Sequence, residues 1–138
     1  MDEDAAAYVS EDEEPIPYLN DLTNRIIGCL IAVHRALGPG YLEAYYERAL
    51  EIEFGRRGMR VSRQHPFEVK YHGVVIGEGR LDFLVEGAVI LELKAVESIS
   101  PVHVATMISY LKANKIKLGI IANFNVRYIK DGIKRIAY

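Results

Sequence analysis

The order of helical and extended segments along this chain predicts an α/β fold in which helices flank a mixed β-sheet. Two segments with helical periodicity come first, several β-favouring segments separated by short turns follow, and a third helical segment precedes a fully apolar strand. Strands joined by short turns pair antiparallel, whereas a helix between two strands usually joins parallel neighbours. Both kinds of pairing are therefore expected in one sheet with helices packed on it.

The helices are predicted from apolar spacing and from the residues that end each segment. Apolar side chains recur every three or four positions over residues 22–37, and Gly38-Pro39-Gly40 should end that helix. A third helix should begin at Pro101, after the cap candidates Ser98 and Ser100. The second helix should begin near Tyr41, with an apolar side formed by Leu42, Tyr45, Ala49, Leu50 and Phe54.

The strands are predicted from β-favouring runs and from the turn signals between them. Pro66 should interrupt the first strand, and Gly77-Glu78-Gly79 should separate a short strand from the next one. The expected strands cover residues 61–71, 74–76, 81–85, 88–96, 118–122 and 133–138.

Length and charge set the domain organisation. The 138 residues, of which 50% are hydrophobic, are sufficient for one domain with a buried core. We expect residues 1–17 to form an acidic flexible tail and residues 18–138 to form that domain. Residues 1–14 hold seven acidic and no basic side chains, so the rest of the chain carries a net charge of +5. This charge suits a polyanionic partner, and ordinary surface charge explains it equally well.

Three features bear on the compartment. No stretch is apolar enough to span a bilayer, no secretory leader is evident, and the single cysteine, Cys29, excludes an internal disulfide framework. We therefore expect a cytoplasmic protein without a membrane partner.

Asp82, Glu92 and Lys94 are charged residues inside otherwise apolar strands. Glu92 and Lys94 share one face because side chains alternate along a strand. A three-residue turn over residues 86–88 would set Asp82 opposite Glu92, with their Cβ atoms about 4.5–5.5 Å apart. A two-residue turn would set Asp82 opposite Leu91 and separate the two acids.

Two carboxylates this close repel each other, and a hard divalent cation relieves the repulsion and also binds phosphate oxygens. A lysine on the same face can orient or help deprotonate an attacking water and can offset developing negative charge. These three side chains would suffice to hydrolyse a phosphodiester. The alternative is a charged, solvent-facing strand pair, and the apolar surroundings give the two interpretations similar weight.

Two further segments could supply residues to the same site. Glu43 and Glu47 lie four residues apart on the second helix and therefore on one face. If that helix packs beside the sheet, Glu43 would reach the metal or position a water, whereas Glu47 is typical of a solvated face with Arg48 nearby. Gln64 on the first strand could hydrogen-bond a ligand or a phosphate.

The spacing of Asp82, Glu92 and Lys94 resembles the D-x(n)-E-x-K core of the PD-(D/E)XK nuclease superfamily. Residues 40–46 read G-x-x-E-x-x-Y and are similar to the signature of the GxxExxY protein family, a branch of that superfamily. The resemblance covers about residues 20–138 and includes His34, Leu37-Gly38-Pro39-Gly40, Gln64, Tyr110-Leu111-Lys112, Asn123-Phe124 and Gly132-Ile133-Lys134-Arg135.

This resemblance implies a restriction-endonuclease-like αβββαβ core with an extra N-terminal helix and a site at one edge of the sheet. It implies that Asp82, Glu92 and the Leu93 carbonyl bind Mg²⁺ or Mn²⁺. It assigns Lys94 to water activation or phosphate contact, and it adds Glu43 to the catalytic set.

The resemblance also bears on substrate contacts. Some relatives carry Q-x-x-x-Y where this chain has Thr106 and Tyr110. His34 is expected to be a packed residue rather than a catalytic one. The substrate-binding candidates are Gln64, Tyr110, Lys112 and His103, and further cations that flank the site in the sequence are Lys70, Arg80, Lys115 and Lys117.

Three functions are compatible with this sequence. The first is a metal-dependent nuclease, with DNA favoured over RNA as the nucleic-acid substrate. The second is a nuclease-fold module that no longer cuts and binds nucleic acid or a protein partner, which Thr106 and the small size favour. The third is an interaction domain whose charged strand face pairs with another chain. A homodimer also fits the first function, because two sites could cut both strands of a duplex.

Overall fold

The computed structural model of the protein describes residues 17–138 and shows the element order that the sequence predicts. The acidic tail predicted over residues 1–17 lies, apart from Pro17, outside the described residues. The helices are α2 (Pro17–Leu37), α3 (Glu43–Arg56), α4 (Pro101–Asn114) and the short 3₁₀ helix η1 (Ile129–Gly132). The strands are β1 (Val61–Tyr71), β2 (Val74–Val85), β3 (Val89–Lys94), β4 (Leu118–Asn123) and β5 (Ile133–Ala137).

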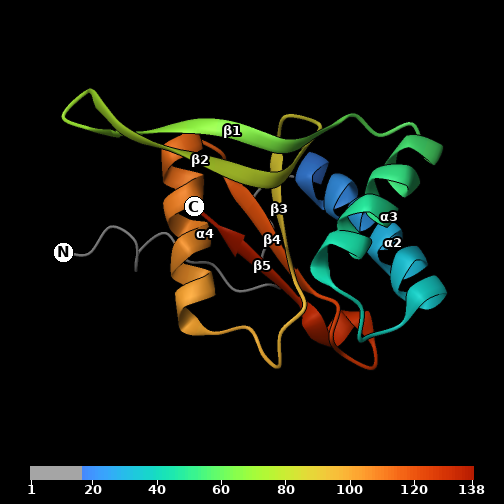
Figure 1. The fold of residues 1–138 in the computed structure, drawn as a ribbon. Coiled ribbons are helices and arrows are strands. Elements are labelled where there is room, and N and C mark those ends of the chain that lie inside the picture. Colours follow the sequence, from blue (N-terminus) through green and yellow to red (C-terminus); the bar gives the residue numbers. More distant parts are fainter. Residues whose placement is uncertain (1–16) are drawn as a thin grey trace.

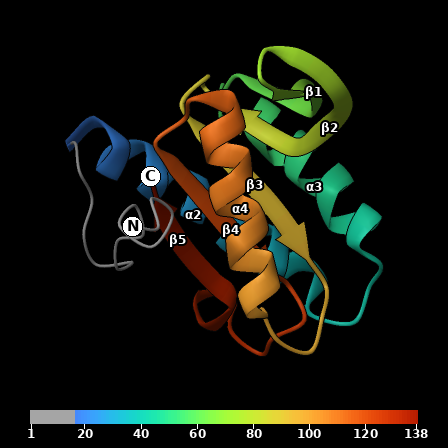
Figure 2. The ribbon, with the colours of Figure 1, turned by 90° about the vertical axis from the view of Figure 1, so that its left-hand side faces the viewer.

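The five strands form one mixed sheet in the order β1-β2-β3-β4-β5. β3 and β4 pair parallel, as a crossover through α4 requires, and the other neighbours pair antiparallel. Figures 1 and 2 show α2 and α3 on one face of the sheet and α4 on the other. Each face has its own apolar cluster. The predicted α/β fold, with an extra N-terminal helix, is therefore confirmed.

The two-stranded ribbon formed by β1 and β2 twists along its length, so that its side chains contact α3 in one part and α4 in another. Phe83 of β2 packs edge-on against Phe54 of α3, with ring centroids 5.3 Å apart, whereas Leu81 belongs to the apolar cluster under α4. In a flat strand these two β2 side chains would share a face. On β1, Gln64 lies at the level of this twist and has a left-handed backbone with φ of 51°. The ribbon therefore contacts both helical layers.

The first two strands are longer than predicted, because both expected breaks are wrong. β1 runs through Pro66, which an edge strand tolerates because an N–H on its outer side needs no partner. β2 runs through Gly77-Glu78-Gly79. A Cβ at Gly79 would lie 2.4 Å from the Phe67 ring. The glycine therefore leaves room for Phe67, which packs against Tyr110 of α4 with ring centroids 5.2 Å apart.

The buried side of α3 also differs from the prediction. Tyr46, Leu50 and Phe54, spaced by four residues, are fully buried, whereas Leu42 and Tyr45 are 69% and 56% exposed. Leu42 precedes the first helical residue, so it lies outside the helical stripe. Tyr46 can be buried because its hydroxyl donates to a backbone carbonyl of the preceding turn over 2.6 Å.

Cys29 is a free thiol on the buried side of α2. Within residues 17–138, no helix combines the length and the apolar content needed to cross a membrane.

We expect Gly132→Ala to destabilise the protein by about 1–3 kcal/mol. A Cβ at this position would lie 2.1 Å from the backbone oxygen of Asn123, so backbone rather than a flexible side chain would have to move. Gly55→Ala is the matched control, because nothing lies within 4 Å of its added Cβ and alanine is the better helix former. Urea denaturation should give a lower midpoint for Gly132→Ala only. Equal midpoints would show that the contact between β4 and η1 relaxes freely.

Candidate active site

The turn between β2 and β3 has the length that brings the two predicted acids together. The antiparallel register pairs Val85 with Val89, so the turn contains three residues, the longer of the two lengths considered from the sequence. Continued along both strands, this register sets Asp82 opposite Glu92. The two acids are thereby placed at the same level of neighbouring strands.

Beyond the Phe83–Leu91 pair, the carboxylates replace backbone acceptors between β2 and β3. The Asp82 N–H donates to Glu92 Oε2 over 2.6 Å. The Leu93 N–H donates to Asp82 Oδ2 over 2.8 Å. Each acid is thus held through one oxygen by the opposite strand, and its second oxygen remains for other partners.

Gln64 links this pair to α3. Its Nε2 donates to the Glu47 carboxylate and lies 3.5 Å from Asp82 Oδ1. Arg63 forms a salt bridge with Glu47 at 3.4 Å, and the Glu47 side chain is only 13% exposed. The prediction of a solvated Glu47 is therefore wrong, because the ribbon of β1 and β2 packs over this part of α3. The left-handed backbone of Gln64 is the kind of local strain that clusters at functional sites.

Burial and mutual repulsion raise the pKa values of the acids. Burial, followed by the charge of Asp82, raises the pKa of Glu92 to about 8. Burial also raises the pKa of Asp82, against the opposing effect of the Leu93 N–H. Partial burial and the charge of Asp82 raise the pKa of Glu43 at the start of α3. Lys94 lowers the pKa of each of these three acids, but it does not neutralise the cluster.

α4 borders the other side of the cluster. A cavity of about 40 Å³ is lined by Glu92, Lys94, His103 and Thr106 together with two apolar residues. A cavity of this size can hold a water. Burial, followed by the charges of the two strand acids, raises the pKa of Tyr110, so this hydroxyl also lies within their field. The structure therefore brings residues of α3, β1, β2, β3 and α4 to one place.

His103 has a structural role as well. The Ser100 N–H donates to His103 Nδ1 over 3.0 Å, and the His103 N–H donates to Ser100 Oγ over 3.3 Å. This reciprocal pair is a capping box at the start of α4. Because Nδ1 accepts a hydrogen bond, the neutral ring carries its proton on Nε2.

One predicted substrate contact, Lys112, and two of the cations that flank the site in the sequence lie away from the acids. Lys112 is exposed and follows Tyr110 by two residues, which is about 200° around α4. Lys115 and Lys117 precede β4, whereas Asn123, at the other end of that strand, pairs with Lys94. Nearness along the sequence was therefore a poor guide to which cations surround the site.

The oxygens of this cluster suit a hard divalent cation. Among residues 17–138, no three histidine, cysteine or acidic side chains converge as a complete metal site. Mg²⁺, however, is usually bound by one or two carboxylates and several waters. Asp82 and Glu92 could supply those carboxylates. A cation between them would also offset the repulsion that contributes to the raised pKa of Glu92.

Glu47 is the site residue that sequence reasoning missed. Its position four residues after Glu43 was the available signal. Only the packing of β1 over α3 distinguishes a network residue from an exposed one at such a position.

We expect the metal-free protein to lose stability as the pH rises from about 5 to about 8. The Glu92 pKa is about 8 in the folded state and 4.5 ordinarily, so between these values the folded state holds a proton that the unfolded chain has released. The protonated Glu92 side chain contributes its full share to the free energy of unfolding at pH values below its pKa in the unfolded chain. This share is lost as the pH rises toward the pKa of the folded state, on the order of 1 kcal/mol per pKa unit.

Urea denaturation in EDTA across this pH range measures the decline. Glu92→Gln should flatten it, because glutamine does not titrate. An equally steep decline in the variant would assign the pH dependence to other groups.

Comparison with known protein families relates this arrangement to a described group. The family model for the PD-(D/E)XK nuclease superfamily matches residues 20–136, which include both strand acids and Lys94. Searches of curated proteins and of solved structures found no significant match.

Proposed function

The chain belongs to the PD-(D/E)XK nuclease superfamily, and we propose that it is a divalent-metal-dependent nuclease that hydrolyses phosphodiester bonds in DNA. The observation that carries this proposal is the pair of carboxylates, Asp82 and Glu92, held together where the pairing of β2 and β3 ends. Partly buried acids whose pKa values are raised by burial and by neighbouring carboxylates are costly in a purely structural protein. In a site that binds a cation and a phosphate, the two carboxylates serve as ligands of the cation.

The proposed metal ligands are one oxygen each from Asp82 and Glu92 and the carbonyl of Leu93. The Leu93 N–H points to Asp82, and the C=O of a β-strand residue leaves the strand on the same side as its N–H. The carbonyl therefore faces the region where backbone pairing with β2 has ended. These ligands would hold a divalent cation, which would supply polarisation of the scissile phosphate and neutralisation of the charge that develops on its oxygens.

The protein's own residues complete the chemistry. Lys94 lines the small cavity beside Glu92, where its ammonium group can donate to an attacking water or a phosphate oxygen and offset negative charge in the transition state. Glu43 lies within the field of Asp82 and is proposed to orient that water. Gln64 holds Asp82 from the side of α3.

Finer assignments belong to the same proposal. Residues 40–46 support membership of the GxxExxY branch, and the buried free thiol of Cys29 suits a cytoplasmic location. Residues 18–138 are proposed to form one nuclease domain that uses Mg²⁺ or Mn²⁺ and works as a homodimer on duplex DNA. The proposed substrate contacts are Gln64, His103 and Tyr110 beside the acids, and Lys112 on another face of α4, where it would contact the nucleic acid away from the acids.

We expect Lys94→Ala and Glu92→Gln each to reduce Mn²⁺-dependent DNA cleavage by at least about 100-fold. The first change removes the ammonium group beside the cavity, and the second removes a proposed metal ligand. Cleavage of end-labelled single-stranded and duplex DNA measures the loss, and circular dichroism shows whether each variant is folded.

Lys117→Ala and Glu68→Gln are matched controls, because both side chains are exposed and lie outside the cluster. They should cleave like the wild type. Undiminished cleavage by the site variants would overturn the proposal. DNA binding in EDTA, without cleavage under any divalent ion, would instead support a nuclease-fold module that binds without cutting.

We expect Mn²⁺ binding to release close to one proton at about pH 7. Glu92, with a pKa of about 8, is mostly protonated before the cation binds and must ionise to coordinate it. Calorimetry in two buffers of different ionisation enthalpy measures the release, and Asp82→Asn should weaken binding by at least about tenfold. Binding that releases no proton and survives Asp82→Asn would place the cation elsewhere.

A further inference from the structure

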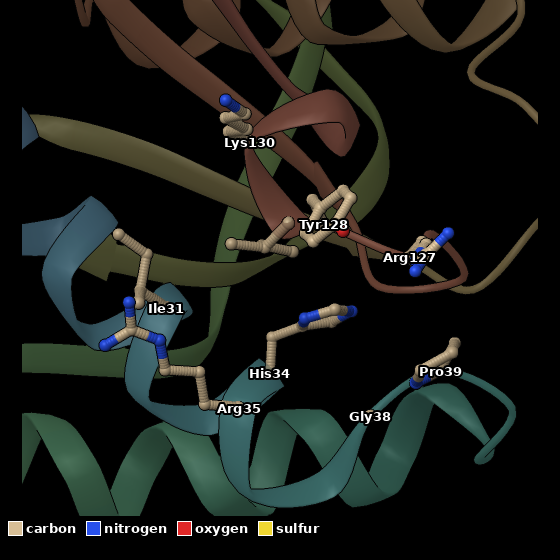
Figure 3. Close-up of a pocket in the computed structure, with 9 residues that line it drawn as sticks. Ile31, His34, Arg35, Gly38, Pro39, Arg127, Tyr128 and Lys130 are labelled. Atoms are coloured by element: carbon tan, nitrogen blue, oxygen red, sulfur yellow. The ribbon is translucent and has the colours of Figure 1, made fainter.

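A cavity of about 500 Å³ lies outside the acid cluster, between the end of α2 and the segment that leads into η1 (Figure 3). Its lining combines cationic, aromatic and apolar side chains, among them Arg35, Arg127, Lys130, His34, Tyr128 and Ile31. None of the 9 lining residues is acidic. Figure 3 shows the three cations on different sides of the cavity, with His34 and Tyr128 between them.

The three cations have no carboxylate partners within residues 17–138. The salt bridges of this part of the chain involve none of Arg35, Arg127 and Lys130. Arg127 lies instead over the ring of Tyr128, 5.3 Å from its centroid. Positive charges around a concave, partly apolar surface concentrate a positive potential there.

Buried residues hold both walls of the cavity in place. His34, which is 7% exposed, donates from Nε2 to the Val126 carbonyl over 2.8 Å and so fixes the segment that carries Arg127. On the other wall, the fully buried Tyr46 donates from its hydroxyl to the Gly38 carbonyl over 2.6 Å. The cavity is therefore preformed, which lowers the entropy lost on binding.

Phe124 connects this cavity to the acid cluster. Its ring stacks on Tyr46, with centroids 4.3 Å apart, and lies 6.2 Å from the ring of His34. Its backbone N–H donates to the Lys94 carbonyl over 2.9 Å. A single residue thus separates a wall of the cavity from the lysine of the proposed active site.

We propose that this cavity is a nucleotide-binding subsite, which takes one base and its phosphate from the strand held at the acid cluster. Its volume matches sites for small organic ligands and exceeds what one phosphate fills. The rings of Tyr128 and His34 suit a base, and the cations suit a phosphate. The identity of the strand rests on the proposed nuclease function, but the binding itself requires no metal.

The test measures binding of a fluorescein-labelled single-stranded oligodeoxynucleotide to the full chain in EDTA, by fluorescence anisotropy. Arg127→Ala combined with Lys130→Ala should raise the Kd roughly tenfold, because charge-assisted bonds to phosphate are lost. The slope of log Kd against log salt should fall by about 0.7 for each phosphate contact removed. The conservative pair Arg127→Lys and Lys130→Arg should retain most of the affinity.

Arg56→Ala combined with Lys117→Ala is the matched control. It removes the same charge from two exposed residues, at the end of α3 and before β4, far along both elements from the cavity. Its Kd should stay within about twofold of the wild type. Equal Kd values for the cavity variant and this control would overturn the subsite, as would a wild-type protein that does not bind the oligonucleotide.

Competition separates the sources of the ligand. Displacement of the oligonucleotide by a free deoxynucleoside monophosphate, lost in the cavity variant, would show that the subsite accepts a free nucleotide. Failure of the mononucleotide to compete, with the Kd effect intact, would assign the subsite to a nucleotide within a strand. Displacement by a polyglutamate peptide at least as strong as by the mononucleotide would overturn the subsite in favour of an acidic protein partner.

Cleavage assays keep this inference apart from the proposed function. In Mn²⁺, the cavity variant should raise KM and leave kcat unchanged, because it does not touch the acids. A wild-type protein that binds DNA through the cavity but never cleaves would overturn the nuclease and keep the subsite. Normal cleavage with an unchanged KM in the cavity variant would overturn the subsite and keep the nuclease.

Discussion

The site depends on two hydrogen bonds that join side chains of β2 and β3 to the opposite backbone. They form where the backbone ladder ends, with Asp82 accepting from Leu93 and Glu92 accepting from Asp82. Because each carboxylate is tied to the neighbouring strand, two like charges are kept close despite their repulsion. Burial, followed by the charge of Asp82, raises the pKa of Glu92, and a bound cation or a proton relieves the repulsion between the two acids.

The twist that carries the β1–β2 ribbon from the α3 side of the sheet to the α4 side decides which helices reach these acids. Phe83 packs toward α3 while Phe67, farther along the ribbon, packs toward α4. Asp82 lies between these two contacts, so polar residues can approach it from both layers. Gln64 connects Asp82 to Glu47 of α3, and Tyr110 belongs to α4. A flat ribbon would have left the acids with one helical neighbour.

Charge is distributed unevenly around the end of the sheet. The acids gather between β2, β3 and α3, whereas Arg35, Arg127 and Lys130 surround a separate cavity beside the α2–α3 turn. Phe124 lies between the two regions and is packed against Tyr46 and His34. A rigid aromatic contact of this kind keeps the two regions at a constant separation, which matters for any ligand that touches both.

The sequence by itself determined the element order, the mixed sheet and the shared face of Glu92 and Lys94. These follow from periodicity and turn signals, which are local properties. The sequence allowed two lengths for the turn after β2, and the structure has the three-residue turn that sets Asp82 opposite Glu92. Only the tertiary structure decided the rest. Pro66 and Gly79 remain within strands because one lies on a sheet edge and the other accommodates Phe67, and Glu47 joins the network because β1 packs over α3. The cationic cavity joins residues about ninety positions apart, such as His34 and Val126, and no local pattern encodes which distant side chains will meet.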